Sequence, residues 1–376
     1  MNKVWSKLDK PLLLLMILFF AFGLMMIFSA SSIVSVVDYN KSPYNFFIKQ
    51  ALFILIGIIA FITIIYIPTR HYGKISKLLI VFIIIALSGL FIYGKVTNNA
   101  KSWYYIGPFS LQPSEFAKSI IIMFMATFYQ NNIKKLNDQK ILLFPLVIVF
   151  IIFALVFLQP DLGTGIIIAL ISLFIYFSLP IKKSYKAKIF MLIMFMFGIC
   201  ILLITTVGDK IFTKTQLERF NFKSPCERYT ESTGYQVCNG YIAINSGGLF
   251  GVGLGNSTQK YLYLPEAHTD FIFPIVVEEL GSIVGVIVIF AYLLLIIRLL
   301  VIAKNSIDLK NSIIAYGVAA YIFCHIAVNL VGILGIGPMT GVPLPFLSYG
   351  GSFCLNLFIC LALVQRCQIE NKTLKQ

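Results

Sequence analysis

The chain has 376 residues, of which 59% are hydrophobic and 12% are charged, and its mean hydropathy is +0.90. Its 30 lysine and arginine residues outnumber its 15 aspartate and glutamate residues, which gives a formal net charge of +15. This composition indicates a polytopic membrane protein and excludes a soluble globular one.

Apolar runs of about 20 residues, the length that crosses about 30 Å of hydrocarbon, recur along the chain. They predict an all-α fold of about ten transmembrane helices, at residues 11–33, 46–67, 76–94, 114–131, 142–158, 164–180, 189–207, 271–300, 312–335 and 347–365. The long connection at about 208–270 is predicted to be one large extracytoplasmic loop. Residues 1–376 are therefore expected to form a single transmembrane domain, with any active site built from helix ends and loops.

Lysine and arginine residues gather in alternate loops, which the positive-inside rule places in the cytoplasm. These residues are Lys3, Lys7, Lys10, Arg70, Lys74, Lys77, Lys134, Lys135, Lys140, Lys182, Lys183, Lys186, Lys188, Arg298, Lys304, Lys310, Arg366, Lys372 and Lys375. Both termini are then cytoplasmic, and the loop at 208–270 lies outside. Because this asymmetry accounts for the net charge, no nucleic-acid partner is expected.

The first polar grouping surrounds the start of the predicted helix at 114–131 and includes Lys101, Trp103, Glu115 and Lys118. Glu115 and Lys118 are three residues apart, so on a helix they share a face one turn into the membrane. A capping box formed with Ser114 or the preceding glutamine would explain Glu115. It does not explain Lys118, because the helix dipole disfavours a cation near the N-terminus. The pattern therefore favours a functional or ion-pair role for Lys118.

The turn between the predicted helices at 142–158 and 164–180 contains Asp161, followed by Gly163 and Thr164. These residues have ordinary turn and N-cap chemistry. A carboxylate at the outer surface is equally a candidate for contact with a substrate. The sequence leaves both interpretations open.

Two of the seven cysteines, Cys226 and Cys238, lie in the predicted external loop and could close a short disulfide there. The sequence does not decide whether they do. The other five, at 200, 324, 354, 360 and 367, fall in or next to helices, where a thiol acts as a small apolar group. The part of the loop at 208–246 is rich in charge, so it is expected to be mobile until a partner or substrate engages it.

Residues 247–281 gather Glu266, His268, Asp270, Glu278 and Glu279 where a polar loop meets an apolar run. An ionisable group at membrane depth costs on the order of 2.5–3.5 kcal/mol, so this cluster predicts chemistry at the membrane surface. Asp270 would cap the next helix, and a carboxylate beside His268 and Glu266 also suits a general base or a metal ligand. Glu278 and Glu279 are expected to pair with a lysine or a backbone donor inside the bundle.

Two stretches rich in glycine or proline are expected to shape the backbone. The five glycines at 247–255 follow no strand and precede no Gly-Lys-Ser/Thr, so they predict a re-entrant or closely packed backbone and no nucleotide or organic cofactor. Residues 341–352 break the apolar pattern, which a membrane tolerates where the backbone lines a cavity. This stretch, with Ser348, is expected to shape a groove through the structural residues Pro343, Pro345, Gly350 and Gly351.

Four motifs taken together resemble the SEDS family (shape, elongation, division and sporulation), which are polytopic bacterial peptidoglycan polymerases. They are GPFSLQPSEFAK at 107–118, QPDLGT at 159–164, LPEAHTDFIF at 264–273 with EELG at 278–281, and GVPLPFLSYGGS at 341–352. The resemblance covers almost the whole chain. GYQ at 234–236, GNSTQK at 255–260 and PEAH at 265–268 are more similar to the division-type branch, or its sporulation relative, than to the elongation-type branch.

The resemblance implies a glycosyltransferase that polymerises lipid II at the outer face of the bacterial cytoplasmic membrane, in septal wall synthesis. Asp270 would be the catalytic base, a divalent metal (Mg²⁺ or Mn²⁺) would bind Asp270 or Glu266, and Glu279 would be structural. The residues expected to contact the substrate are Lys101, Trp103, Glu115, Lys118, Asp161, His268 and Ser348. The implied partners are a class B penicillin-binding protein transpeptidase and other divisome membrane proteins.

The chain departs from the family pattern before the tryptophan at 103. The family usually has Asn-Gly-Ala, a variable residue and then Arg-Trp, whereas this chain has Asn99 in place of the glycine and Ser102 in place of the arginine. Lys101 would supply the missing cation from the neighbouring position.

Two other functions remain open from the sequence. A transporter that moves lipid II across the membrane would use the same intramembrane charges. A non-catalytic scaffold would only recruit the transpeptidase.

Overall fold

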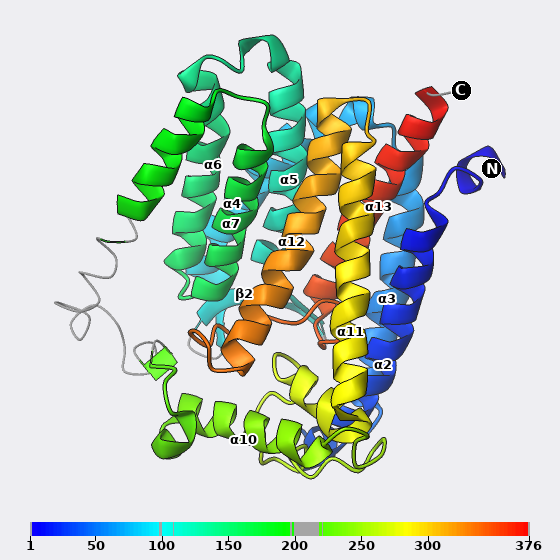
Figure 1. Ribbon diagram of the computed structural model, residues 1–376, viewed down its shortest axis with the longest axis vertical. Helices are drawn as coiled ribbons and strands as arrows, with labels where there is room; N and C mark the ends of the chain where they lie inside the picture. The colour runs from blue at the N-terminus through cyan, green and yellow to red at the C-terminus, as the bar shows by residue number, and fades with distance from the viewer. Residues whose placement is uncertain are drawn as a thin grey trace.

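The protein is a bundle of long helices in a computed structural model that describes residues 2–97, 100–107, 109–195, 198, 218–219 and 221–374 (Figure 1). The long helices are α2 (Lys10–Val37), α3 (Asn45–Tyr66), α4 (Tyr72–Tyr93), α5 (Pro113–Asn131), α6 (Gln139–Phe157), α7 (Leu162–Ser178), α11 (Ile272–Lys304), α12 (Leu309–Ile333) and α13 (Gly351–Leu374). Shorter elements are α1 (Asn2–Trp5), η1 (Thr69–His71), η2 (Ile133–Lys135), η3 (Pro225–Arg228) and α10 (Ser232–Gly247).

Within the described residues, seven helical segments are long and apolar enough to cross a membrane: α2, α3, η1 with α4, α6, α11, α12 and α13. The helices α5 and α7 coincide with predicted spans, and residues 183–195 are helical where the predicted span at 189–207 begins. The rest of that span, with Cys200, lies outside the described residues. The all-α, multi-pass fold is confirmed, and the count of ten stays a prediction.

The helices divide into central and peripheral ones. In the most apolar window of each helix, 78% of α13 and 67% of α12 is buried, compared with 28% of α3. Peripheral helices leave large apolar side chains such as Leu78, Phe82 and Phe150 exposed. In a multi-pass membrane protein this exposed apolar surface faces lipid, so the polar groups of α5, α12 and α13 lie far from lipid.

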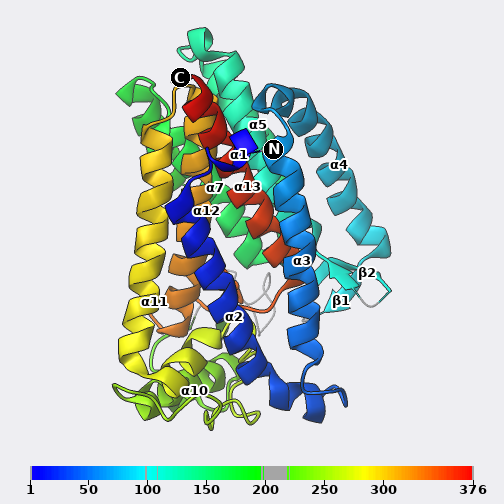
Figure 2. The same cartoon turned by 90° about the vertical axis from the view of Figure 1, so that its right-hand side faces the viewer.

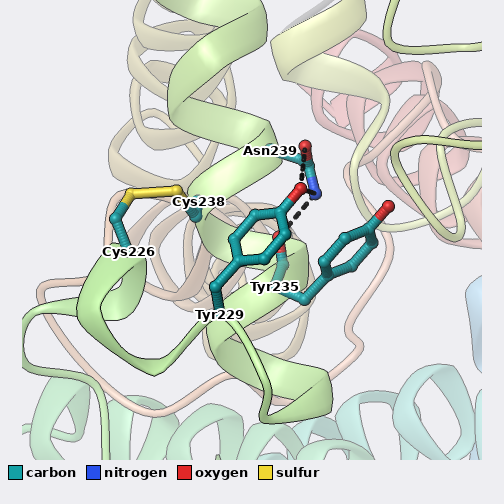
Figure 3. The surroundings of a disulfide bond; sticks show 5 residues. All are labelled: Cys226, Tyr229, Tyr235, Cys238 and Asn239. Carbon is teal, nitrogen blue, oxygen red and sulfur yellow. Dashed lines mark hydrogen bonds between the residues drawn. A yellow bond between two sulfur atoms is a disulfide. The ribbon is translucent and has the colours of Figure 1, made fainter.

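Both ends of the chain lie at one end of the bundle, and α10 lies across the opposite end (Figure 1). Lys7 Nζ donates to Thr373 Oγ1 at 3.1 Å, which joins the two ends. The described part of the loop contains α10, which packs against α11, and the mobility expected for 208–246 stays a prediction. Cys226 and Cys238 form a disulfide that ties η3 to α10, beside Tyr229 (Figure 3). The sequence left this disulfide open, and the structure shows that it forms.

A small antiparallel sheet follows α4, in the order β1 (Lys95–Thr97), β2 (Ala100–Ile106) and β3 (Phe109–Leu111), and lies at the lower end of α4 in Figure 2. Tyr104 pairs with Leu111 across β2 and β3. The Tyr104 hydroxyl also donates to the Ala86 carbonyl of α4 at 2.8 Å. The all-α prediction missed this sheet because β1 and β3 have only three residues each, too few to show an alternating pattern, and β2 (AKSWYYI) does not alternate regularly between polar and apolar residues.

The long helix α11 is broken at Gly281, whose φ of 87° and ψ of 163° are not helical. The glycine-rich loop before it fills the break. Val252 N and Gly253 N bind the carbonyls of Glu278 and Glu279, and Ser282 N binds the carbonyl of Gly248, all at 2.9–3.0 Å. The predicted closely packed backbone is therefore confirmed, because the loop satisfies the groups that the break leaves unpaired.

Candidate active site

Asp270 lies just before α11, at the end of the bundle that carries α10. The N-cap residue of α11 is Phe271, so the expected capping role of Asp270 is wrong. Its Oδ2 instead lies against Gly341, 3.6 Å from the position that a Cβ would occupy there. Desolvation by burial, with the charge of Glu266 adding to it, raises the pKa of the Asp270 carboxyl to about 7. The charge of Arg219 opposes this rise in pKa only in part.

Glu266 and Asp270 share one hydroxyl group. Thr269 Oγ1 lies 2.6 Å from Glu266 Oε2 and 3.1 Å from Asp270 Oδ1. A hydroxyl has a single proton to donate, so it serves only one of the two carboxylates at a time. The other carboxylate then has unused acceptor capacity, which a proton or a cation can fill.

His268 belongs to an aromatic group rather than to this carboxylate pair. Its ring centroid lies 4.6 Å from that of Phe46 and 5.9 Å from that of Tyr349. The Tyr349 amide donates to the His268 carbonyl at 2.9 Å. Desolvation lowers the pKa of the His268 imidazole, so this side chain is neutral at pH 7. Its contact with the substrate stays a prediction.

Glu115 and Lys118 form a buried ion pair on α5, with Lys118 Nζ 2.8 Å from Glu115 Oε1. The pairing predicted from their spacing is confirmed. The capping box is wrong, because the N-cap residue Gln112 makes no side-chain cap and the Ser114 hydroxyl has no partner among the described residues. Lys118 Nζ also lies 3.0 Å from His325 Nε2. The ammonium is thus enclosed by protein.

Asp161 has the N-cap role that the sequence offered for a turn residue, and it also binds a second helix. Its Oδ1 accepts from Thr164 N at 3.2 Å and caps α7. Its Oδ2 accepts from Gln112 Nε2 at 2.8 Å, which joins the starts of α5 and α7. Both oxygens are therefore engaged within the protein, and contact with a substrate stays a prediction.

Glu278 and Glu279 pair with backbone donors and a lysine, as expected, and these bonds join the loop before Asp270 to α11. Glu278 accepts from Ser257 Oγ and Thr258 N. Glu279 pairs with Lys260, whose Nζ lies 2.8 Å from its Oε1. The sequence did not identify Lys260 as the partner, because sequence spacing does not show that its loop folds back to α11.

The stretch 341–352 forms the wall opposite Asp270 and the entry to α13. Ser348 Oγ accepts from Leu344 N at 2.8 Å, so this hydroxyl holds the turn, and its contact with the substrate stays a prediction. Gly350 N donates to Gln50 Oε1 at 3.2 Å. A Cβ on Gly351 would lie 2.3 Å from the Phe53 ring, so only glycine permits this contact between α13 and α3.

Comparisons with known proteins identify the family. The profile of the FtsW/RodA/SpoVE family, described as a cell cycle protein, matches residues 9–373. The chain belongs to this family. The Bacillus subtilis protein named "Probable peptidoglycan glycosyltransferase FtsW" is 36% identical, over 100% of this chain and 95% of that one. Stage V sporulation protein E of the same organism is 36% identical over 92% of both chains.

Solved structures of family members share the fold. Thermus thermophilus RodA matches with a TM-score of 0.68 and 22% identity, over 96% of both chains. A chain from a peptidoglycan synthase complex that coordinates polymerization and crosslinking matches with a TM-score of 0.76 and 21% identity, over 97% of this chain and 98% of that one. At these identities the likeness establishes the fold alone. This is the SEDS family that the four motifs resemble.

Ser102, which stands where the FtsW/RodA/SpoVE family usually has arginine, is buried on β2, and its hydroxyl has no partner among the described residues. Lys101 is exposed. Successive residues of a strand point to opposite faces, so Lys101 does not occupy the place of the side chain at 102. That Lys101 supplies the missing cation from the neighbouring position stays a prediction. Lys101 and the half-buried Trp103 remain candidates for substrate contact from β2.

Sequence reasoning missed several polar residues around the site. Asn329 Nδ2 donates to the carbonyls of Asp270 and Val342, both at 2.8 Å. His325 precedes Asn329 by one helical turn and is fully buried. Two polar residues spaced by four in an apolar run are a signal for a shared buried face. This signal was available in the sequence.

The residues that would hold a metal fit it only in part. The described residues contain no group of three or more His, Cys, Asp or Glu side chains with metal-binding geometry. Asp270 and Glu266 supply two carboxylates that compete for the Thr269 hydroxyl. Magnesium commonly binds one or two carboxylates and takes its other ligands from water and substrate phosphates. The pair therefore supplies at most two of the ligands that Mg²⁺ takes, and a bound metal stays a prediction.

Proposed function

We propose that this protein is a peptidoglycan glycosyltransferase that polymerises lipid II at the outer face of the cytoplasmic membrane during septal wall synthesis. The names of its relatives, 36% identical over nearly full length, support this activity. The observation that carries the proposal is the Asp270 carboxyl, placed against Gly341 with a pKa of about 7. A general base works best when its pKa lies near the operating pH.

The reaction joins two lipid-linked sugars. The 4-hydroxyl oxygen of one lipid II attacks the anomeric carbon of the other sugar chain, and the bond from that carbon to the pyrophosphate oxygen breaks. Asp270 accepts the hydroxyl proton, and the polyprenyl pyrophosphate leaves with the bonding electron pair. Asn329 binds the carbonyl of Asp270, which fixes the backbone that carries the base. Attack opposite the leaving group inverts the configuration of the anomeric carbon.

The leaving pyrophosphate requires positive charge close to it. Lys101 is exposed on β2 and is free to approach it, whereas Lys118 is enclosed with Glu115 and His325. We therefore assign Lys118 to the support of the fold around the site rather than to direct contact. A divalent metal on Asp270 or Glu266, when bound, would supply Lewis-acid charge for the pyrophosphate.

The polyprenyl tail requires an apolar channel open to lipid. A cavity of about 580 Å³ lies between α3, α4, α5 and α13, and its lining is almost wholly apolar. Phe82, one of its lining residues, is also exposed on the outer face of α4. We propose that this cavity receives a polyprenyl tail, because tail binding would position the sugar head group at the outer surface.

We further propose a class B penicillin-binding protein transpeptidase as the partner, together with other divisome membrane proteins. The solved relative from a complex of polymerization and crosslinking supports such an assembly. The two chain ends lie together, opposite α10, which fits cytoplasmic termini and an outer α10 under the positive-inside rule. We also propose enrichment at the division septum, which the likeness to the FtsW relatives supports.

The experiment uses proteoliposomes that contain the purified protein with its transpeptidase and fluorescent lipid II. Polymer is measured by gel, and movement of lipid II between leaflets is measured by accessibility to an external quencher. Polymer without an increase in movement supports the glycosyltransferase. Movement without polymer would support the transporter, and neither signal from an intact complex would support the scaffold.

A further inference from the structure

His325 is a fully buried imidazole in the middle of the membrane-spanning bundle. It lies on α12, and its ring centroid is 4.8 Å from that of Tyr321 and 4.8 Å from that of Phe353. Burying a polar group in such surroundings is costly unless its polar atoms are bonded. The partners of the two ring nitrogens therefore indicate what the residue does.

The two nitrogens face chemically opposite partners. His325 Nε2 lies 3.0 Å from Lys118 Nζ, and His325 Nδ1 lies 3.2 Å from the Pro343 carbonyl oxygen. An ammonium group only donates hydrogen bonds, and a carbonyl only accepts them. The imidazole is therefore neutral, with its proton on Nδ1, and it links α5 to the loop at 341–346.

That loop depends on side chains because it contains two prolines. Pro343 and Pro345 have no N–H group, so neither residue can itself donate a backbone hydrogen bond that would hold the loop. Their carbonyls instead accept from His325 Nδ1 and from the Tyr292 hydroxyl of α11. The neighbouring Val342 carbonyl accepts from Asn329 Nδ2. Side chains of the central helices thus fix the loop at each of these three carbonyls.

The same loop faces the proposed base. Asn329 lies one helical turn after His325 and binds the Asp270 and Val342 carbonyls with one amide group. Gly341, the next residue back along the loop, lies against Asp270 Oδ2. A shift of Pro343 would therefore move the surface against which the carboxylate rests.

We infer that His325 is a positioning residue for glycosyl transfer, which holds the proline loop against Asp270 from a buried anchor at Lys118. The inference rests on the proposed function. The simpler alternative is that His325 only provides an acceptor for the buried Lys118 ammonium. The two differ in which ring nitrogen matters for catalysis.

Three substitutions separate the two nitrogens. His325→Asn places an amide near the Nδ1 position and keeps a donor for the Pro343 carbonyl. His325→Gln reaches the Nε2 position and keeps an acceptor for Lys118. His325→Phe has a ring of similar size and keeps neither bond. For each purified variant in complex with the transpeptidase, kcat and KM for lipid II polymerisation are measured, together with the unfolding midpoint in detergent.

The inference predicts that His325→Phe lowers kcat by about 10- to 100-fold, because misplacement of catalytic groups costs rate. KM for lipid II should change by less than about threefold, because substrate binding is not altered. His325→Asn should restore most of the lost kcat, and His325→Gln should not.

Three results would overturn the inference: wild-type kcat in His325→Phe, restoration by His325→Gln alone, or a loss of kcat that only follows the unfolding midpoint. If His325→Phe does not fold, the comparison of His325→Asn with His325→Gln decides the matter. Absence of polymer from the wild-type complex would instead contradict the proposed function itself.

Discussion

Lys260 and Glu279 offer the sharpest test of how the loop before Asp270 is attached to the bundle. Lys260 Nζ binds Glu279 Oε1 at 2.8 Å, Ser29 Oγ at 3.1 Å and the Gly255 carbonyl at 2.6 Å, which uses all three of its donors. Glu279 is fully buried and also accepts from Ser29 Oγ. These contacts join α2, α11 and the loop before Asp270. Removal of Lys260 alone would leave a buried, unpaired carboxylate.

The expected magnitude follows from the distance and the burial. Two unit charges 2.8 Å apart attract by about 6 kcal/mol at an effective dielectric constant of about 20. The cost of desolvating both groups offsets much of this attraction. Removing one partner of a buried pair costs about 3–5 kcal/mol. We therefore expect Lys260→Met to lower the free energy of unfolding by about this amount.

The assay is unfolding of the purified protein in mixed micelles, with single variants Lys260→Met and Glu279→Gln and the double variant. Because the double variant buries no unpaired charge, its cost should fall below the sum of the single costs by at least about 2 kcal/mol. Lys223→Met, at an exposed lysine of the same external region, is the control and should change the free energy little. Additive costs, or a Lys260→Met effect no larger than that of the control, would refute this account of the loop anchor.

Gly281→Ala and Gly251→Ala should each reduce folded yield severely, because the added Cβ would lie 2.2 Å from the Leu249 carbonyl oxygen in the first and 2.3 Å from the Glu279 carbonyl oxygen in the second. Gly255 has positive φ but open space around it, so Gly255→Ala should lower the free energy of unfolding by only about 1–3 kcal/mol. Equal losses in the three variants would contradict the packing argument. Burial, reinforced by the charge of Glu266, raises the pKa of Asp270 to about 7. In the presence of a chelator, kcat/KM should therefore rise with pH through about 7 as the base ionises, and added Mg²⁺ should move this midpoint to lower pH. A flat profile from about pH 5.5 to 8 would argue against Asp270 as the base. Cys226→Ser should destabilise the α10 region by about 3 kcal/mol, since the disulfide closes a short loop, and should speed its cleavage by protease; unchanged cleavage would show that packing alone orders this region.

The sequence predicted the helices well because each is a long apolar run, and it predicted the Glu115–Lys118 pair because both residues lie on one helix. Contacts between residues far apart in the sequence could not be predicted from it. Lys260 meets Glu279, and Ser29 joins them, only because a glycine loop fills the break in α11. The short strands gave no periodic signal, and the disulfide that ties η3 to α10 was left open by the sequence.

Within the candidate site, the sequence identified Asp270 but misjudged its surroundings. An aspartate before an apolar run predicts an N-cap, which keeps a carboxylate ionised at low pH. The structure places Phe271 at the cap and Asp270 against Gly341, and desolvation raises the carboxyl pKa instead. The loop at 341–346 is far from Asp270 in sequence, so only the fold could show this contact.

The central claim is that Asp270 is the base of a lipid II polymerase. Its most direct test is polymer formation from labelled lipid II by the wild-type complex and by Asp270→Asn, which keeps the shape of the side chain and removes the base. Asp308→Asn serves as the matched control, because Asp308 is at the N-terminal end of α12, whereas Asn329 near its C-terminal end binds Asp270. We expect polymer from the wild type and the control and none from Asp270→Asn in an intact complex. Polymer from Asp270→Asn at the wild-type rate would contradict the claim.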